Sequence, residues 1–186
     1  MKTRLIFAVA ALTLAGCEDR EIKVYDIPKE TGTSAPVVSA KPQWVVPSGW
    51  QELPPTGMRV ASFSSGRGDA KELDVSVVTF PGEAGGLLAN VNRWRGQMKL
   101  EPVADTTGIE TQDVAGQPLQ IVEFSEPGQD HAMLGAIFLR PDQSWFVKLT
   151  GSKATVAAEA VRFREFAQSF RFPLPSRAAP KSANDG

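Results

Sequence analysis

The sequence predicts an α+β domain, in which an antiparallel sheet of about six or seven strands is covered by two amphipathic helices. Three observations predict this class. Several segments alternate apolar and polar residues, which is typical of strands. Two segments change to an apolar period near 3.6, which is typical of helices. Short turns containing Gly and Pro separate the strands, and such turns join antiparallel neighbours.

Residues 58–63 and 73–80 are expected to form two early strands, joined as a hairpin by a polar turn that contains glycine. In the first of them, Met58 and Val60 share one face. The second alternates regularly, and three of its apolar residues share one face: Leu73, Val75 and Val77.

The first helix is expected over residues 86–99, between two β-rich halves of the chain. The breakers Pro81-Gly82 and Gly85-Gly86 precede it and Pro102 follows it, which limits where it begins and ends. Its apolar residues form one stripe that should pack on the sheet: Leu87, Val91, Trp94 and Met98.

The second half of the chain is expected to form four more strands and the last helix. The strands are residues 109–114, 119–124, 131–140 and 145–149. Residues 131–140 are apolar on both faces, which predicts a central strand, and Lys148 stands alone on the polar side of the last one. The helix spans residues 155–170, with a buried stripe of Val156, Ala160, Phe163, Ala167 and Phe170.

We interpret the N-terminus as a targeting segment. Lys2 and Arg4 precede the apolar residues 5–15, which are too few to span a bilayer as a mature helix. The following Leu14-Ala15-Gly16-Cys17 resembles the lipobox of bacterial lipoproteins. This resemblance implies cleavage before Cys17 and attachment of diacylglyceryl to its sulfur. A plain secretory signal with an incidental cysteine is the alternative.

Four regions follow from these patterns. They are a lipoprotein signal peptide (1–16), a flexible tether from lipidated Cys17 (17–42), an α+β globular domain (43–173) and a disordered tail (174–186). The expected location is the cell envelope, on the extracytoplasmic face of a membrane. Stable anchoring needs more than one acyl chain, such as an added palmitate. The choice between inner and outer membrane stays open.

The order of the elements, the Trp-and-Gly opening and the closing Ser169-Phe170-Arg171-Phe172 resemble the PsbP-like fold. That fold occurs in the extrinsic photosystem II subunit and in a Ran-binding protein. The resemblance covers residues 43–173. Residues 80–98 also resemble a segment that recurs in bacterial lipoproteins of uncharacterised function. Neither resemblance implies catalytic residues.

The chain offers little for catalysis or for metal binding. Cys17 and His131 are the only cysteine and the only histidine, so they cannot form a zinc or iron cluster. No Gly-x-Ser-x-Gly elbow is present. We therefore expect that the protein has no cofactor, no bound metal and no enzymatic activity. A net charge of −1 gives no general reason for nucleic-acid binding. A small envelope hydrolase that uses His131 is kept as an alternative.

Two glycine-containing motifs are interpreted as turns. The run Gly82-Glu83-Ala84-Gly85-Gly86 leads into a helix and could meet an anion with its backbone N–H groups. It lacks the P-loop spacing, so a turn packed on the sheet is favoured. Arg67-Gly68-Asp69 matches an integrin-binding tripeptide, and a turn is favoured there as well.

The first helix carries the strongest candidate for a binding surface. Asparagine is a poor helix former, and Gly96 is less favourable than Ala by about 1 kcal/mol, so a helix selected for stability alone would avoid both. Five polar residues are expected on its exposed side: Asn90, Asn92, Arg93, Arg95 and Gln97.

The predicted function is therefore a lipid-anchored binding or assembly module of the cell envelope without catalytic activity. Arginine favours contacts with carboxylates and phosphates, so an acidic segment of an envelope protein or another anionic group is the expected partner. A structural lipoprotein with no specific partner is a further alternative.

Overall fold

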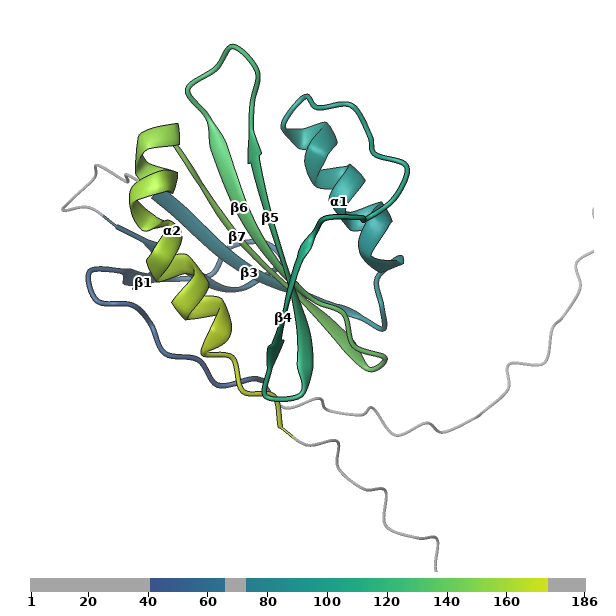
Figure 1. Cartoon of the computed structure of the whole chain (residues 1–186). Coiled ribbons are helices and arrows are strands. Elements are labelled where there is room, and N and C mark those ends of the chain that lie inside the picture. Colours follow the sequence, from purple (N-terminus) through teal and green to yellow (C-terminus); the bar gives the residue numbers. More distant parts are fainter. Residues whose placement is uncertain (1–40, 66–72, 174–186) are drawn as a thin grey trace, which may run out of the picture. The chain divides into compact units, whose positions relative to one another are not determined.

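The computed structural model describes residues 41–65 and 73–173. The predicted signal peptide, the tail, most of the tether and the Arg67-Gly68-Asp69 tripeptide lie outside these residues. The described part forms one seven-stranded antiparallel sheet with a helix against each face (Figure 1). The predicted fold class is therefore confirmed.

The strands lie in the order β1-β2-β3-β7-β6-β5-β4, and every neighbouring pair is antiparallel. The pairing of β3 with β7 runs from Leu73 opposite Gly151 to Pro81 opposite Gln143, and it joins the early hairpin to the second half of the chain. The sequence patterns did not predict β1. The bounds are β1 Gln51–Leu53, β2 Arg59–Ser64, β3 Leu73–Pro81, α1 Gly86–Gln97, β4 Glu110–Val114, β5 Gln117–Ser125, β6 Ala132–Phe138, β7 Gln143–Gly151 and α2 Lys153–Gln168.

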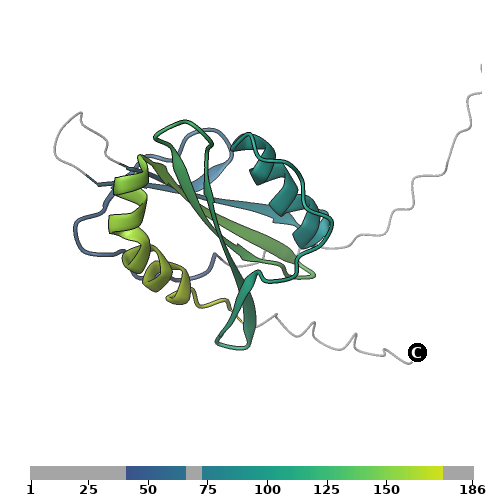
Figure 2. The same ribbon diagram turned by 45° about the horizontal axis from the view of Figure 1, so that its top comes forward.

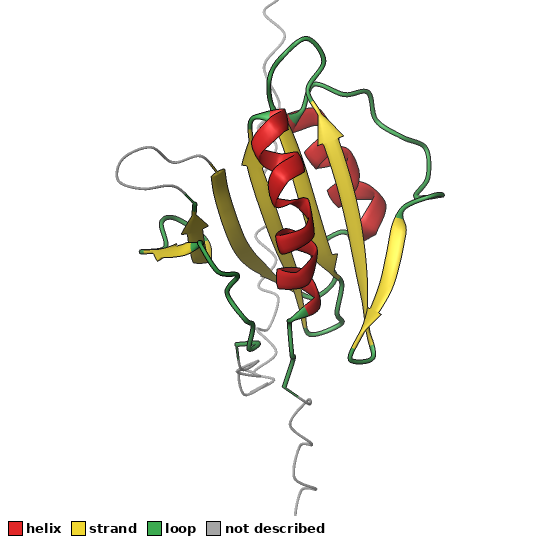
Figure 3. Cartoon of the chain, turned by 60° about the vertical axis from the view of Figure 1, so that its left-hand side comes forward, coloured by secondary structure: helices red, strands yellow, loops and turns green. Residues whose placement is uncertain are grey.

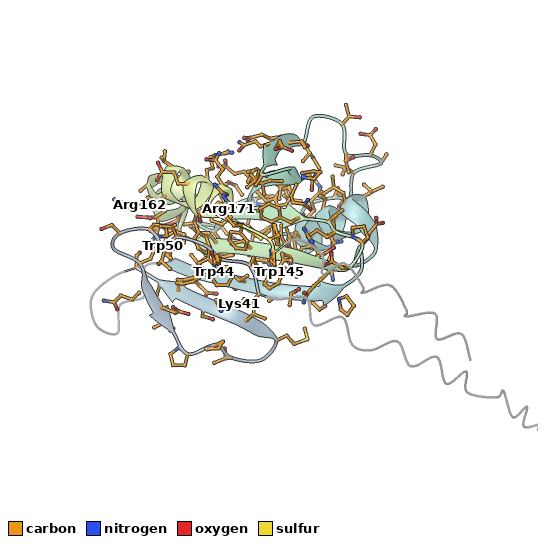
Figure 4. The ribbon with its side chains drawn as sticks, turned by 90° about the horizontal axis from the view of Figure 1, so that it is seen from below. Lys41, Trp44, Trp50, Trp145, Arg162 and Arg171 are labelled. Atoms are coloured by element: carbon orange, nitrogen blue, oxygen red, sulfur yellow. The ribbon has the colours of Figure 1, made fainter. Side chains whose placement is uncertain are left out.

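One face of the sheet packs against α2, which lies in front of the strands in Figure 3. The buried residues of α2 include Phe163 and Phe166. Trp50 packs edge-on against Phe166 at 5.3 Å between ring centroids, and its indole N–H donates to Glu159 Oε2 at 2.9 Å. Trp44 stacks on Phe170 at 5.1 Å, and both tryptophans are labelled in Figure 4. The segment before β1 therefore completes this core.

Helix α2 begins at Lys153, two residues earlier than the sequence pattern predicted. The reason is the N-cap, because the Ser152 hydroxyl accepts a hydrogen bond from the Thr155 backbone N–H at 3.0 Å. The helix ends at Gln168 rather than at Phe170, but Phe170 remains fully buried in the turn that follows.

The other face of the sheet packs against α1, so the two helices lie on opposite sides of the strands (Figure 2). The predicted stripe is confirmed, since Val91, Trp94 and Met98 are buried and Leu87 is partly buried against the same cluster. The strand residues in this cluster come mainly from β5, β6 and β7: Val122, Phe124, Met133, Ile137 and Phe146. The side of this face nearest β2 carries polar residues, and there an open cavity remains beside α1.

Candidate functional site

The exposed position predicted for Asn90 is wrong, because this side chain is fully buried. Its amide nitrogen donates to the carbonyl oxygens of Ala84 at 3.0 Å and Gly86 at 2.6 Å. Ala84 precedes the helix and has a left-handed backbone (φ 50°), so no helical N–H reaches its carbonyl. Asn90 supplies that donor, and its own oxygen accepts a hydrogen bond from Arg93.

Asn92 and Arg95 hold the chain that follows α1. The Asn92 side chain makes two hydrogen bonds with the Val103 backbone, accepting from its N–H at 2.8 Å and donating to its oxygen at 2.9 Å. Arg95 Nε donates to the Glu101 carbonyl oxygen at 2.7 Å. These contacts account for both asparagines in the helix without any partner, so the asparagines no longer argue for a binding surface.

The remaining two residues of the predicted surface, Arg93 and Gln97, line a cavity of about 260 Å³ between α1, β3 and β7. We call it the α1 cavity. Its floor follows the β3–β7 register, in which Ser76 lies opposite Lys148 and Val78 lies opposite Phe146. One row of the floor is therefore polar and the next row is apolar. Phe80 and the exposed Met58 extend the apolar part.

Lys148 is the main cation of the α1 cavity. Its ammonium donates to Gln97 Oε1 at 2.7 Å and lies 5.3 Å from the Trp94 ring centroid. Within residues 41–65 and 73–173, Lys148 forms no ion pair with a carboxylate. The carboxylate of Asp74 is bound by both terminal nitrogens of Arg59, at 2.6 and 2.8 Å.

Burial lowers the pKa of Lys148, and the positive charges of Arg93 and Arg59 lower it further, while Asp74 opposes them. The charged form of Lys148 is thus incompletely compensated by its surroundings. An anion that enters the α1 cavity would stabilise this charged form, since an opposite charge at close range favours ionisation.

Trp94 forms the wall of the cavity, and a single glycine determines where its ring lies. A Cβ added to Gly135 in β6 would lie 2.1 Å from Trp94 Cζ3, so the indole packs directly on the glycine backbone. Glycine is unfavourable inside a strand, and this close approach is the reason for its presence. The ring also meets Phe146 edge-on, at 6.1 Å between centroids.

The other candidates from the sequence are not assembled into a site. His131 lies half-buried just before β6, and its imidazole has no hydrogen-bond partner in the described part of the chain. The Gly82–Gly86 run is a turn fixed to the sheet, because Ser144 Oγ donates to the Gly82 oxygen at 2.7 Å. No group of three or more His, Cys, Asp or Glu that could hold a metal is present among the described residues.

A second cavity, of about 350 Å³, lies between Arg140 and Phe172. The Arg140 guanidinium is bonded to Asp142 and Gln117 and lies 4.7 Å from the Phe172 ring centroid. Its charge is already matched, so the α1 cavity is the better candidate for binding an anion. No helix among the described residues has the length and apolar character needed to cross a membrane.

No protein-family model and no curated protein sequence matches the chain. Solved structures do match. A protein from Bacteroides thetaiotaomicron VPI-5482 has 15% identity and a TM-score of 0.45, with 74% of this chain and 47% of that chain covered. The match therefore spans about half of that protein.

Two further structures are similar over most of their length. Cyanobacterial PsbP (CyanoP) from Synechocystis sp. PCC 6803 has 14% identity and a TM-score of 0.48, with 70% of this chain and 85% of that chain covered. LpqN of Mycobacterium tuberculosis, described as involved in cell envelope biogenesis, has 12% identity and a TM-score of 0.49, with coverages of 73% and 86%. A PsbP is thus among the similar structures, as the order of elements predicted. No function is carried over from them.

Proposed function

We propose that this protein is a lipid-anchored, non-catalytic binding module of the cell envelope that holds its partner by an anionic group in the α1 cavity. The observation that carries the proposal is Lys148, a partly buried cation without a carboxylate partner among the described residues. Arg93 lines the same cavity and adds a second positive charge.

Both cations are held in place before a ligand arrives. Lys148 extends from a central strand and is bonded to Gln97, and Arg93 is bonded to the buried Asn90. Such preorganisation reduces the entropy lost on binding. Charge-assisted hydrogen bonds from Lys and Arg to a carboxylate are also stronger than neutral ones. The proposed contact is therefore the cavity beside α1 rather than the outer surface of the helix.

The absence of catalysis in this proposal is supported by what lines the cavity. Ser76 is the one hydroxyl among the described lining residues. Lys148 is the lining group that could act as its base, but the Lys148 ammonium donates to Gln97 and no hydrogen bond between described residues joins it to Ser76. His131 lies outside the described lining of this cavity, so the hydrolase alternative has no geometric support.

The envelope location in this proposal is supported by the N-terminal sequence alone. Leu14-Ala15-Gly16-Cys17 has the spacing of a lipoprotein processing site, and Cys17 is the only cysteine. Acylation there would hold the domain at a membrane surface, where partners are membrane or envelope proteins. The proposed partner is such a protein, which presents an anionic group to the α1 cavity.

The test is co-purification from detergent-solubilised membranes after crosslinking. We compare wild type with the double variant Lys148→Gln, Arg93→Gln. The matched control is Lys153→Gln, which removes an exposed positive charge at the start of α2. We expect the double variant to fold and to lose the partner that wild type and the control retain. Full retention by a folded double variant would show that the partner is held elsewhere and would refute the proposed contact in the α1 cavity.

A further inference from the structure

The α1 cavity also restricts the chemistry of what it holds. We infer that it takes a carboxylate joined to an apolar body of about one aromatic ring. This inference rests on the proposed function and adds the size and shape of the ligand. We base this inference on the two ends of the cavity, on its volume and on its hydrogen-bond donors.

The β3–β7 register separates the two ends. Ser76 and Lys148 form the polar row, and Val78 and Phe146 form the next row on the same face. Residues that alternate on a strand are spaced about 7 Å apart. A ligand that meets both rows must therefore join its charged group to its apolar group through only a few atoms.

The apolar end of the α1 cavity consists of side chains that an apolar ligand group could cover. Phe80 meets Phe146 edge-on at 5.9 Å between ring centroids, and both line the cavity. Met58 lines it too, with 72% of its surface exposed. Methionine is flexible and polarizable and adapts to apolar ligands. An inorganic anion alone would leave this apolar end open to water.

The volume limits the apolar body. A cavity of about 150 Å³ can hold a benzene molecule. The α1 cavity, at about 260 Å³, therefore has room for one ring, a carboxylate and a short link. Pockets for drug-sized ligands are larger, from about 300 to 1,000 Å³.

The donors favour a carboxylate over a phosphate. Phosphate sites commonly use free backbone N–H groups at a helix N-terminus. The α1 cavity instead presents side chains from strands and from the later turns of α1, where backbone N–H groups are already bonded within the helix or the sheet. Lys148, Arg93 and the Ser76 hydroxyl can donate hydrogen bonds to the two oxygens of a carboxylate.

A ligand with a carboxylate and a compact apolar body could come from two sources. One is a free aromatic or similarly compact apolar acid. The other is the C-terminal residue of an envelope protein, in which an apolar side chain and the terminal carboxylate are attached to the same Cα. An internal Asp or Glu lacks the attached apolar body.

The experiment uses the whole mature chain with Cys17→Ser, so that no detergent is needed, and measures binding by calorimetry. The probes are hydrocinnamate, its neutral counterpart hydrocinnamyl alcohol, and propionate, which lacks the ring. Hydrocinnamate should bind at least tenfold more tightly than either. Lys148→Gln should weaken hydrocinnamate binding by about tenfold or more, because the charge-assisted hydrogen bond to the carboxylate is lost. Lys153→Gln should leave binding unchanged.

Peptides that end in Phe, with a free or an amidated C-terminus, distinguish the two sources. Binding of the free-acid peptide alone assigns the site to a protein C-terminus. Binding of hydrocinnamate without either peptide assigns it to a free acid. Equal binding of acid and alcohol, or no binding of any carboxylate, overturns the inference. If co-purification still requires Lys148 in that case, the proposed function stands without this ligand. If hydrocinnamate binds but the Lys148 variant still co-purifies with the partner, the ligand inference stands and the envelope-partner function fails.

Discussion

Gly135→Ala tests the packing that forms the α1 cavity. The new Cβ would lie 2.1 Å from Trp94 Cζ3, 2.7 Å from Cε3 and 2.9 Å from Val122 Cγ2. Restoring an ordinary contact of 3.4 Å to Cζ3 requires a shift of about 1.3 Å, the difference between 3.4 and 2.1 Å. The ring is only 5% exposed and has Phe146 beside it, so it has little room to move.

We expect Gly135→Ala to lower the free energy of unfolding by about 2–4 kcal/mol. Overpacking a core typically costs about 1–3 kcal/mol, and losing a buried Trp costs about 3–5 kcal/mol, which sets the upper bound. The midpoint of thermal unfolding should fall by roughly 3–5 °C for each kcal/mol of lost stability in a domain of this size. Urea denaturation followed by circular dichroism gives the free energy directly.

A double-mutant cycle separates the clash from other effects. In a Trp94→Ala background the ring is absent and only the contact with Val122 Cγ2 at 2.9 Å remains, so adding Gly135→Ala should cost clearly less than it does in wild type. Gly96→Ala is the matched control, because a Cβ there meets nothing within 4 Å and its backbone is helical. That change should stabilise α1 by about 0.5–1 kcal/mol. An equal cost of Gly135→Ala in both backgrounds would refute the proposed packing.

Three other predictions concern charge, the chain after α1 and the anchor. Because the pKa of Lys148 is lowered by burial, the unfolded chain binds this proton more tightly. Wild type should therefore gain stability relative to Lys148→Met as the pH rises from 7 towards about 10.4; urea unfolding at several pH values checks this, and a constant difference contradicts it. Asn92→Ala should cost about 1–3 kcal/mol and speed amide exchange at Val103, because two backbone groups lose their partner; unchanged exchange would show that other contacts hold this segment. Cys17→Ser should move the protein out of the membrane fraction or block its processing, and a wild-type intact mass showing an unlipidated mature chain that begins elsewhere would disprove the anchor.

Much of the fold could be predicted because local patterns carry it. The alternation in residues 73–80 predicted β3, and the 3.6 period from Leu87 to Met98 predicted α1 with the correct buried stripe. Such periodicities report which face of an element is apolar, and that face must be buried. The short strand β1 escaped prediction because its three residues, Gln51–Leu53, are mostly exposed and show no pattern.

The candidate site could be predicted only in part. Asn90, Asn92 and Arg95 were correctly placed on α1, but their polarity alone could not distinguish solvent from a buried carbonyl that needs a donor. Lys148 was identified only as one polar residue on a strand. Its role as a partly buried cation depends on β3 pairing with β7 and on α1 crossing above them, which are contacts between distant segments.

By itself, the sequence determined the fold class, most element positions, the buried stripe of each helix and the lipobox pattern at Cys17. These features depend on neighbours within a few residues along the chain. The tertiary structure alone decided that Asn90 is buried, that Gly135 receives the Trp94 ring and that Lys148 faces Arg93 across a cavity. The physical reason is that burial, close packing and desolvation are set by residues far apart in sequence, and periodicity does not record which of them meet.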